Sequence, residues 1–364
     1  MGADYILVIN PGATSTKIAV YRNNQSVFLK SIRHESGELE TFARTSDQLP
    51  YRLNLVLSEV EENHIPHDKV GMIIARGGLI HPIESGVYEV NEVMIKDLEE
   101  GVMGDHASNL GGLVAHRLLE TFTQARAYIA DPVVVDEMDE VARISGHPEF
   151  RRTSIFHALN QKSVARSHAH SMGLEYEEIN LVVVHMGSGI SVGAHQKGRV
   201  VDVNNALDGE GPFGPERSGT LPAGALARYC FQEGNSWNRV TKMLTGEGGM
   251  FAYLGHKDAQ LLEKMTGEGD AEAGLIQNAL AYQVSKEIGA MAAVLSGSID
   301  GILITGGMAH NPGLTGAIKE RIEFMAPVYI YPGEDEMRAL AHNGSLLLSG
   351  KVSVKQYIGK KSGK

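Results

Sequence analysis

Short runs of β-branched and other apolar residues alternate along the chain with longer stretches in which apolar residues recur at every third or fourth position. The short runs have the length and composition of strands. Eight are predicted, at residues 5–10, 16–21, 70–75, 127–130, 181–185, 190–194, 302–305 and 328–331. The longer stretches predict helices at residues 46–63, 107–122, 222–233 and 275–295. Because strands alternate with helices, the pattern predicts an α/β protein with substantial parallel pairing.

Two segments about half a chain apart repeat one pattern. Residues 6–20 read ILVINPGATSTKIAV and residues 181–194 read LVVVHMGSGISVGA. Each has a buried-type strand, one polar residue (Asn10 or His185), a glycine-bearing turn and a second strand. This repeat predicts a duplicated domain rather than a solenoid. We expect one domain over residues 1–150 and another over residues 151–336, with a last helix within 337–364 that packs back onto the first.

The composition adds one unusual feature, which is 42 glycines in 364 residues. They cluster beside serine, threonine and histidine, as in loops where the backbone approaches a ligand closely. A formal net charge of −11 argues against a nucleic-acid surface, which needs a basic footprint. The longest mostly apolar stretch, 288–299, is too short to span a bilayer, and the amino terminus lacks a signal-peptide pattern. We therefore expect a cytoplasmic protein, and its single cysteine, Cys230, as a buried thiol.

Several familiar signatures do not fit. No GxxxxGK[ST] motif exists, and the GxGxxG at residues 209–214 contains a proline and does not lead from a strand into a helix. Two histidine pairs, His64 with His67 and His168 with His170, have no cysteine or carboxylate at ligand spacing. The first pair lies in a polar loop and the second in a charged helical stretch. We expect both pairs at the surface.

The repeated hairpin turns have the chemistry of phosphate-binding loops. Small residues let backbone N–H groups and hydroxyls approach a phosphate, while Lys17 supplies a positive charge. The alternative is an ordinary hairpin with a surface lysine. A third glycine pair follows the strand 302–305 and precedes a helix expected after Pro312. The predicted nucleotide-binding residues are Gly12, Ser15, Lys17, His185, Gly187, Ser188, Gly189, Gly306, Gly307 and Asn311.

Seven motifs in order resemble the family of acetate and butyrate kinases. They are INPGATSTK, ARGG, GDHASNLGG, SIFHALNQK, HMGSGIS, ERSGT and ITGGMAHN, and they extend from residue 9 to residue 311. The family belongs to a superfamily with sugar kinases, Hsp70 and actin. The resemblance implies two duplicated ribonuclease H-like domains with ATP in a cleft between them, and the cofactors ATP/ADP and Mg²⁺.

The resemblance also implies roles for single residues. Arg76 and Arg217 match the two active-site arginines, and arginine suits a planar phosphoryl group that accumulates charge. Asn10, His106 and His157 match further catalytic positions. Asp131 matches an active-site aspartate and a magnesium ligand. For a second magnesium ligand three acids compete, and spacing from Pro332 favours Glu336 or Asp335 over Glu334, with Glu336 preferred.

This sequence departs from acetate kinases at FHALNQ, where they read FHGTSH, and at ARGGLIHP, where they read RxVHGG. Both departures resemble butyrate and branched-chain fatty-acid kinases within the family. The implied activity is reversible transfer of the γ-phosphoryl group from ATP to butyrate or a similar short-chain acid. Isobutyrate, acetate and propionate stay open as substrates, and a homo-oligomer is implied.

Two readings from other classes remain. A sugar kinase needs an aspartate base, for which Asp202 or Asp208 is available. An actin- or Hsp70-like ATPase module does not need Arg76 and Arg217.

Overall fold

The computed structural model describes residues 5–12, 14–39 and 41–360. Contacts divide the chain into two compact units: unit 1 comprises Met1–Val135 with Asp335–Lys364, and unit 2 comprises Asp136–Glu334. The first division falls earlier than residue 150, because the segment after Val135 bonds to unit 2. Glu137 forms an ion pair with Lys162 at 2.7 Å, and the Asp139 N–H donates to the Val201 carbonyl at 3.0 Å.

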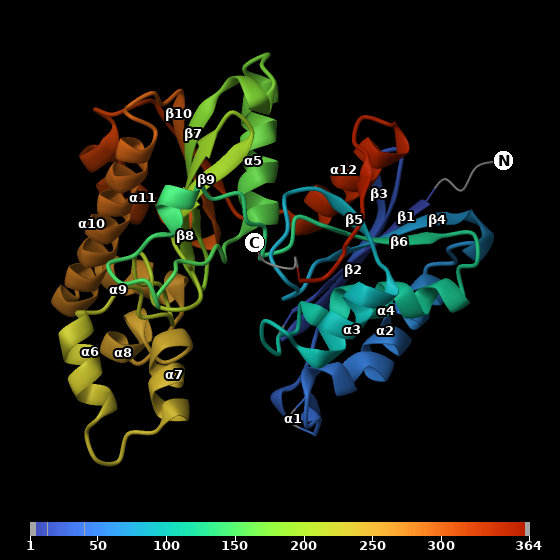
Figure 1. Cartoon of the computed structure of the whole chain (residues 1–364), viewed down its shortest axis with the longest axis horizontal. Coiled ribbons are helices and arrows are strands. Elements are labelled where there is room, and N and C mark those ends of the chain that lie inside the picture. Colours follow the sequence, from blue (N-terminus) through green and yellow to red (C-terminus); the bar gives the residue numbers. More distant parts are fainter. Residues whose placement is uncertain (1–4, 13, 40, 361–364) are drawn as a thin grey trace. The chain divides into compact units, whose positions relative to one another are not determined.

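Unit 1 is built on a seven-stranded sheet with the order β12-β5-β6-β4-β1-β2-β3 (Figure 1). Its strands are β1 Tyr5–Pro11, β2 Ser15–Arg22, β3 Gln25–Arg33, β4 Val70–Arg76, β5 Val87–Glu89, β6 Arg126–Ala130 and β12 Val354–Lys355. Its α-helices are α1 Ser36–Leu39, α2 Leu49–Glu62, α3 Glu92–Glu100, α4 Asn109–Arg117 and α12 Glu336–Leu348, with 3-10 turns at Thr45–Gln48, His67–Lys69 and Leu118–Glu120.

Side chains of the central strands of unit 1 point alternately to the two faces of the sheet, and both faces are covered by helices. Leu7 and Ile9 pack in one core cluster with residues of α2 and α4. On the opposite face α12 contacts β1 and β4. Gly344 allows this close approach, because a Cβ there would lie 2.8 Å from the Met72 sulfur. The last helix thus packs on the first sheet.

Unit 2 has a five-stranded sheet with the order β11-β10-β7-β8-β9. Its strands are β7 Asn180–Met186, β8 Ile190–Gln196, β9 Arg199–Val203, β10 Gly301–Gly306 and β11 Val328–Pro332. Helices α10 and α11 share a core cluster with one face of the sheet, and α5 packs against the other. Its helices are α5 Ala158–Ser171, α6 Ala223–Cys230, α7 Trp237–Thr245, α8 Gly249–Leu254, α9 Ala259–Gly267, α10 Ala271–Val294 and α11 Pro312–Ile322, with 3-10 turns at Glu140–Arg143, Tyr176–Glu178 and Gly307–His310.

The two sheets repeat one topology, which confirms the predicted duplication. Strands β3-β2-β1-β4-β6 correspond to β9-β8-β7-β10-β11, with the first two pairings antiparallel and the last two parallel in both sheets. Even the irregularity recurs: the register shifts between Val20 and Tyr21 in β2 and between Ala194 and His195 in β8. The two hairpins of the sequence repeat therefore occupy the same position in separate sheets.

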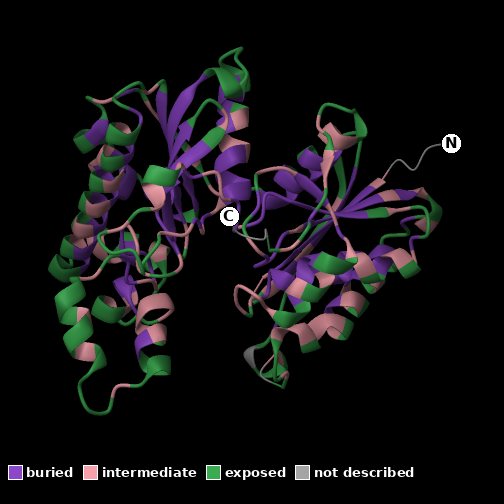
Figure 2. Ribbon diagram, in the orientation of Figure 1, coloured by how far each residue is buried: buried purple, intermediate pink, exposed green. Residues whose placement is uncertain are grey.

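All eight predicted strands are present, but other elements were missed. Among the described strands, β3 lies at the edge of its sheet beside β2 and leaves Val27 and Leu29 about half exposed, so it lacks a buried apolar run. Most residues of the strands in the middle of the sheets are buried, whereas the outer helices expose many of theirs (Figure 2). Among the described residues, no helix is long and apolar enough to cross a membrane.

Two expectations about burial were wrong. Cys230 is exposed, because α6 contributes no buried residue within the described chain. His168 is buried, although His170, two positions along α5, is exposed. The ring of His168 lies on the face of α5 that packs against the sheet, and its Nδ1 is 2.8 Å from the Tyr331 hydroxyl.

Candidate active site

The ends of two adjacent strands in unit 1 present Asn10 and Arg76. In the parallel register of β1 and β4, Ile9 is opposite Ala75, so the residues that follow lie side by side on one face. The first turn of α12 adds Glu336, which is 8% exposed. Its Oε2 accepts from Asn10 Nδ2 at 2.5 Å, and its Oε1 is 3.2 Å from Arg76 Nη1. Three predicted residues, distant in sequence, thus form one polar cluster, in which Asn10 and Glu336 are buried and Arg76 is partly exposed.

The three acids that competed in the sequence have different environments. Asp335 is the N-cap of α12, and its Oδ1 accepts from the Arg338 N–H at 3.0 Å. Glu334 belongs to unit 2, where its Oε2 is 3.5 Å from His185 Nε2. Of the three, Glu336 is the acid in contact with Asn10 and Arg76.

Lys17 lies on the same sheet face as Asn10, because the two residues are directly opposite in the antiparallel pair of β1 and β2. Ser15 and Lys17 are in turn opposite Arg33 and Ser31 on β3. Sequence analysis missed these β3 residues because it missed the strand. Residues of β2 and β3 line a cavity of about 430 Å³, which is bordered by Thr14, Ser15, Lys17, Ser31, Arg33 and His34.

A buried arginine behind the first hairpin was also missed. Arg52 of α2 is 1% exposed, and its guanidinium donates to the carbonyls of Gly12 and Ser15 at 3.2 and 3.3 Å. It also donates to Thr16 Oγ1 at 2.5 Å, and burial lowers the pKa of Arg52. Arg52 therefore fixes the carbonyls of the turn. The one available signal was an arginine four residues before Val56 on the apolar face of the helix.

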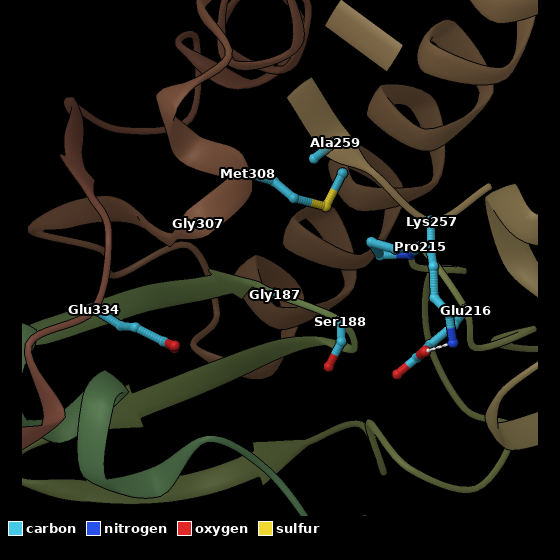
Figure 3. A pocket seen from close by; sticks show the side chains of 9 residues that line it. All are labelled: Gly187, Ser188, Pro215, Glu216, Lys257, Ala259, Gly307, Met308 and Glu334. Carbon is cyan, nitrogen blue, oxygen red and sulfur yellow. Dashed lines mark hydrogen bonds and ion pairs between the residues drawn. The ribbon is translucent and has the colours of Figure 1, made fainter. Parts of the chain in front are cut away.

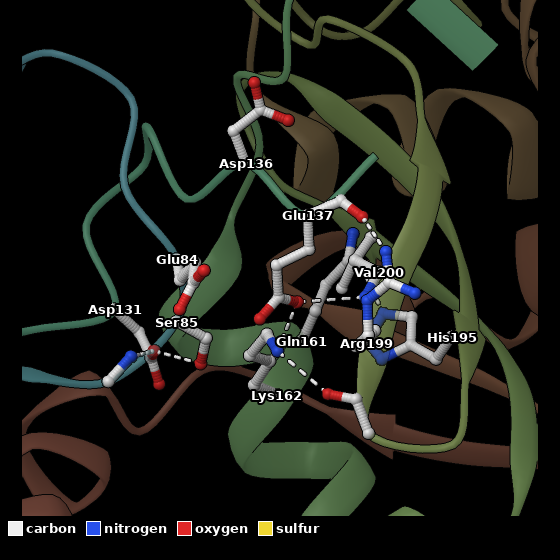
Figure 4. A network of polar contacts seen from close by, with 12 residues as sticks. Glu84, Ser85, Asp131, Asp136, Glu137, Gln161, Lys162, His195, Arg199 and Val200 are labelled. Atoms are coloured by element: carbon white, nitrogen blue, oxygen red, sulfur yellow. Dashed lines mark hydrogen bonds and ion pairs between the residues drawn. The ribbon is translucent and has the colours of Figure 1, made fainter. Parts of the chain in front are cut away.

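Asp131 and His106 lie in loops of unit 1 with partners of their own. Asp131 follows β6 with a left-handed φ of 37°. Its Oδ1 accepts from Ser85 Oγ at 2.6 Å and from the Gly86 N–H at 2.9 Å (Figure 4). His106 precedes α4, and its Nδ1 accepts from the Ser108 N–H at 3.2 Å. In the neutral ring the proton is then on Nε2.

The second hairpin turn borders a pocket of unit 2 (Figure 3). Its volume is about 380 Å³, and the predicted Gly187, Ser188 and Gly307 lie in its wall. An ion pair of 2.5 Å joins Glu216 to Lys257 at one side. Glu216 adjoins Arg217 in a quoted motif, whereas nothing in the sequence marked Lys257. The full lining is Gly187, Ser188, Pro215, Glu216, Lys257, Ala259, Gly307, Met308 and Glu334.

Two other predicted glycines of unit 2, each next to a residue of this lining, permit close approaches. Gly306 has φ of 92°, and a Cβ there would lie 2.4 Å from the Met186 carbonyl oxygen. A Cβ on Gly189 would overlap Nη1 of Arg217. That nitrogen donates to the Ala206 carbonyl at 2.8 Å. Arg217 therefore lies across the turn because Gly189 has no side chain.

Asn311 has a structural role beside its predicted contact with the nucleotide. It is the N-cap of α11, and its Oδ1 accepts from the Leu314 N–H at 2.9 Å. Its Nδ2 donates to Gln277 Oε1 at 2.9 Å. Both ends of the amide are thus engaged.

His157 and His185 form a stacked pair in unit 2. Their ring centroids are 3.8 Å apart and the ring planes differ by 13°. His157 is the N-cap residue of α5, and its Nδ1 is 2.9 Å from Ser191 Oγ. His185 is 1% exposed, and its Nδ1 is 2.8 Å from Asn160 Oδ1. The structure therefore brings both predicted histidines together.

The cluster of unit 1 offers oxygen atoms suited to Mg²⁺. Glu336 supplies a buried carboxylate, and Asn10 Oδ1 is buried with no hydrogen-bond partner within the described part of the chain. Mg²⁺ prefers such oxygens and usually keeps several waters, so one or two carboxylates suffice. No group of three or more His, Cys, Asp or Glu forms a site among the described residues. These residues fit a hydrated Mg²⁺ rather than a closed protein cage.

Comparison with known proteins agrees with the predicted family. The model of the acetokinase family matches residues 148–327. Butyrate kinase 2 of Clostridium acetobutylicum is 49% identical over 352 residues, which are 97% of this chain and 99% of that protein. Butyrate kinase 1 of the same organism is 48% identical over the same shares of both chains.

Solved structures are similar in fold. Porphyromonas gingivalis acetate kinase superposes with a TM-score of 0.77 at 18% identity, over 95% of this chain and all of that chain. A propionate kinase from Francisella tularensis gives a TM-score of 0.74 at 17% identity, over 93% and 98% of the two chains. The resemblance seen in the seven motifs is confirmed. Because 49% identity extends along nearly the whole of both proteins, the chain belongs to the acetokinase family.

Proposed function

We propose that this protein transfers the γ-phosphoryl group of ATP reversibly to the carboxylate of butyrate or a similar short-chain fatty acid, giving an acyl phosphate and ADP. It is an ATP-dependent carboxylate kinase. The observation that carries the proposal is the 49% identity with a butyrate kinase over 97% of the chain.

The substrate determines what the protein must supply. A fatty-acid carboxylate is ionised at neutral pH, because model carboxyl pKa values are near ~4. It therefore needs no general base, unlike the hydroxyl of a sugar. Catalysis consists of alignment and of stabilising the negative charge that spreads over the phosphoryl oxygens.

In unit 1 we assign this work to Arg76 and Asn10. Arg76 donates to the phosphoryl oxygens in the transition state, and Glu336 holds its guanidinium in place through the ion pair of 3.2 Å. Lys17, opposite Asn10 in the sheet, contributes positive charge at the phosphates. His106 and Asp131 complete the proposed set on loops.

In unit 2 we assign the nucleotide phosphates to the pocket at the second hairpin turn. The Gly187 N–H donates to the Gly189 carbonyl at 3.0 Å and closes the turn, so we assign the anion to the N–H groups of Ser188 and Gly189, where small residues leave the backbone open. Gly306, Gly307, Asn311 and His185 are assigned to the nucleotide as well. Arg217 and His157 donate to the transferring group. Arg217 is held by its bond to Ala206.

Magnesium completes the proposed chemistry. Glu336 and Asp131 would hold Mg²⁺, directly or through water, with Asn10 Oδ1 beside Glu336. When bound, the ion neutralises charge on the phosphate oxygens of ATP. We expect Glu336 to be the dominant ligand, because it lies beside Asn10 Oδ1, a buried oxygen with no hydrogen-bond partner among the described residues.

A sugar kinase is the less supported alternative. Of its two candidate bases, Asp202 forms an ion pair of 2.8 Å with Arg152, which is better suited to a structural role than to accepting a proton. An actin-like module would not require the arginines at residues 76 and 217. Within the carboxylate kinases, isobutyrate, acetate and propionate remain alternatives, since one methylene changes selectivity by only about 1–3 kcal/mol.

The proposal extends to assembly and compartment. Phe231, at the end of α6, and Trp237, the first residue of α7, are 93% and 82% exposed, which supports a homo-oligomer that covers them. Light scattering on the purified chain would give the stoichiometry. We place the protein in the cytoplasm, where ATP and free short-chain acids occur together.

The reverse reaction tests the proposal with little background. Purified protein is mixed with ADP, Mg²⁺ and butyryl phosphate, and ATP is measured by luciferase. We expect ATP to form in proportion to enzyme, and Arg76→Ala to abolish most of it. Absence of ATP with butyryl, isobutyryl, propionyl and acetyl phosphate would refute the proposal.

A further inference from the structure

A chain of polar side chains runs through the interior of unit 2 and ends at His157. It joins His157, Ser191, Gln161, His195 and Tyr176, from helix α5, strand β8 and the 3-10 turn before β7. Ser191, Gln161 and His195 are each 0% exposed, and Tyr176 is 3% exposed. Gln161 and His195 are drawn in Figure 4. Polar groups buried this deeply must satisfy one another.

The direction of each bond in the chain is fixed by its acceptors. Gln161 approaches the Ser191 carbonyl at 3.1 Å, and a carbonyl can only accept, so the amide nitrogen Nε2 faces Ser191. The other end of the amide, Oε1, is 2.9 Å from His195 Nε2, which must therefore carry the proton. His195 Nδ1 then accepts from the Tyr176 hydroxyl at 2.6 Å.

Two further features support this arrangement. Burial first, then Lys162 and Arg166, lower the pKa of His195 well below its usual range. His195 is therefore neutral and has one proton to place. Gly193 leaves room for the bond, because a Cβ there would lie 2.7 Å from Gln161 Oε1.

Ser191 links Gln161 to His157 and determines which ring nitrogen of His157 carries the proton. Ser191 Oγ accepts from Gln161 Nε2 at 2.8 Å and, more weakly, from the His157 backbone N–H at 3.5 Å. A hydroxyl oxygen has two lone pairs, so both are used. Its own proton is then donated to His157 Nδ1 at 2.9 Å. In neutral His157 the ring proton is consequently on Nε2.

We propose that Gln161 is a positioning residue that, with His195, Tyr176 and Ser191, holds neutral His157 in the tautomer protonated at Nε2, so that this nitrogen donates a hydrogen bond to the transferring phosphoryl group. The inference rests on the role proposed above for His157. Its stacking on His185 fixes the plane of the ring, and Gln161 fixes its proton. With the opposite tautomer, a lone pair would face the phosphoryl oxygens and repel them.

Gln161→Glu tests this reasoning with little change of shape. The variant is studied at about pH 9, where a carboxyl group whose pKa is raised by burial is ionised, and a carboxylate accepts but does not donate. The Ser191 hydroxyl must then turn to donate to the new side chain, and its oxygen becomes an acceptor for a proton on His157 Nδ1. We expect the tautomer of His157 to reverse. Gln277→Glu is the matched control: it places the same change at another buried glutamine of unit 2, one that contacts Asn311.

The readout is the ¹⁵N spectrum of the imidazole rings in full-length protein labelled on its fifteen histidines. His157 is assigned from the signals that disappear in His157→Gln. The parent and Gln277→Glu should show Nε2–H, and Gln161→Glu should show Nδ1–H. Finding Nδ1–H in the parent, or no change in Gln161→Glu, would overturn the proposal.

A second variant guards against misfolding of the first. Gln161→Met keeps the length of the side chain but removes both bonds, so His157 should populate both tautomers. A single Nε2–H tautomer in that variant would also overturn the proposal.

Kinetics give an independent measure. Gln161→Glu should lower kcat for acyl phosphate formation by about 10- to 100-fold, with KM for ATP changed by less than about 3-fold. The spectrum needs no activity. If the parent phosphorylated no carboxylate, the proposed function would fail while the tautomer assignment would still be tested.

Discussion

Gly189→Ala should displace the guanidinium of Arg217 while leaving that residue itself unchanged. A methyl group at residue 189 would overlap Nη1 of Arg217 and lie 2.8 Å from its Cζ and from the Ala206 carbonyl oxygen, where ordinary contact begins at 3.4 Å. The guanidinium must move by at least about 0.6 Å at Cζ and lose its bond to Ala206. Gly189 does not have a left-handed φ, so alanine is not strained by its own backbone conformation, but the Ala206 carbonyl must also shift slightly to clear the methyl group.

The kinetic effect follows from this displacement. A misplacement of about 1 Å at a catalytic group can cost about 10²-fold in rate, and losing one preorganised donor costs about 10²–10³ in kcat. We expect Gly189→Ala to lower kcat with butyrate by about 10- to 100-fold and Arg217→Ala by 10²–10³. KM for ATP should change little in either, since the contact is made in the transition state.

A double-mutant cycle isolates the mechanism. If the methyl group acts through Arg217, the double variant should be no slower than Arg217→Ala alone, because the two residues are in contact. Gly316→Ala serves as control, since a Cβ there meets nothing within 4 Å. Losses that multiply in the double variant, or full activity in Gly189→Ala, would refute the reasoning.

Other predictions concern Arg76, Glu336 and Glu287. Arg76→Ala should lower kcat by about 10²–10³ with little change in KM for ATP, and Arg76→Lys should restore little, because an ammonium cannot form the planar two-pronged contact; recovery in the lysine variant would contradict this. Glu336→Gln should raise the Mg²⁺ concentration for half-maximal activity by about 10- to 100-fold; an unchanged Mg²⁺ titration would exclude it as a ligand. The pKa of Glu287 is raised by burial, then by Asp202 and Glu210, against Arg152 and Lys286. Ionised Glu287 thus destabilises the fold as pH rises above the ordinary carboxyl pKa near ~4. Glu287→Gln should therefore raise the urea midpoint of unfolding at pH 7.5, and this gain should disappear as pH falls to about 4. An equal gain at both pH values would refute the charge effect.

The fold could be predicted where strands are buried on both faces. Such strands read as continuous apolar runs, as in β1, β4, β7 and β10, and their repetition predicts the duplication. Strand β3 escaped because its outer position demands few apolar residues. The burial of His168 was not predicted because helix α5 has mostly polar residues and buries several of them, Gln161 and Lys162 included, so its buried face has no apolar pattern.

The candidate site divides in the same way. Asn10, Arg76 and His185 are polar residues at the ends of buried strands, a position that sequence alone reveals. Glu336 was preferred from spacing, but its contact with Asn10 spans most of the chain and only the fold shows it. Arg52 has one local signal, its position four residues before Val56 on the apolar face of a helix, and that signal does not reveal its contacts with the turn.

Trapping of acyl phosphate with hydroxylamine tests the central claim most directly. Purified protein is incubated with saturating ATP, Mg²⁺ and each straight-chain or branched acid from C2 to C6, and the hydroxamate formed is measured by its iron complex. We predict hydroxamate with C3 to C5 acids, greatest with butyrate or isobutyrate, that requires ATP and is lost in Arg217→Ala. Phosphorylation of sugars with no hydroxamate from any C3 to C5 acid would contradict the account.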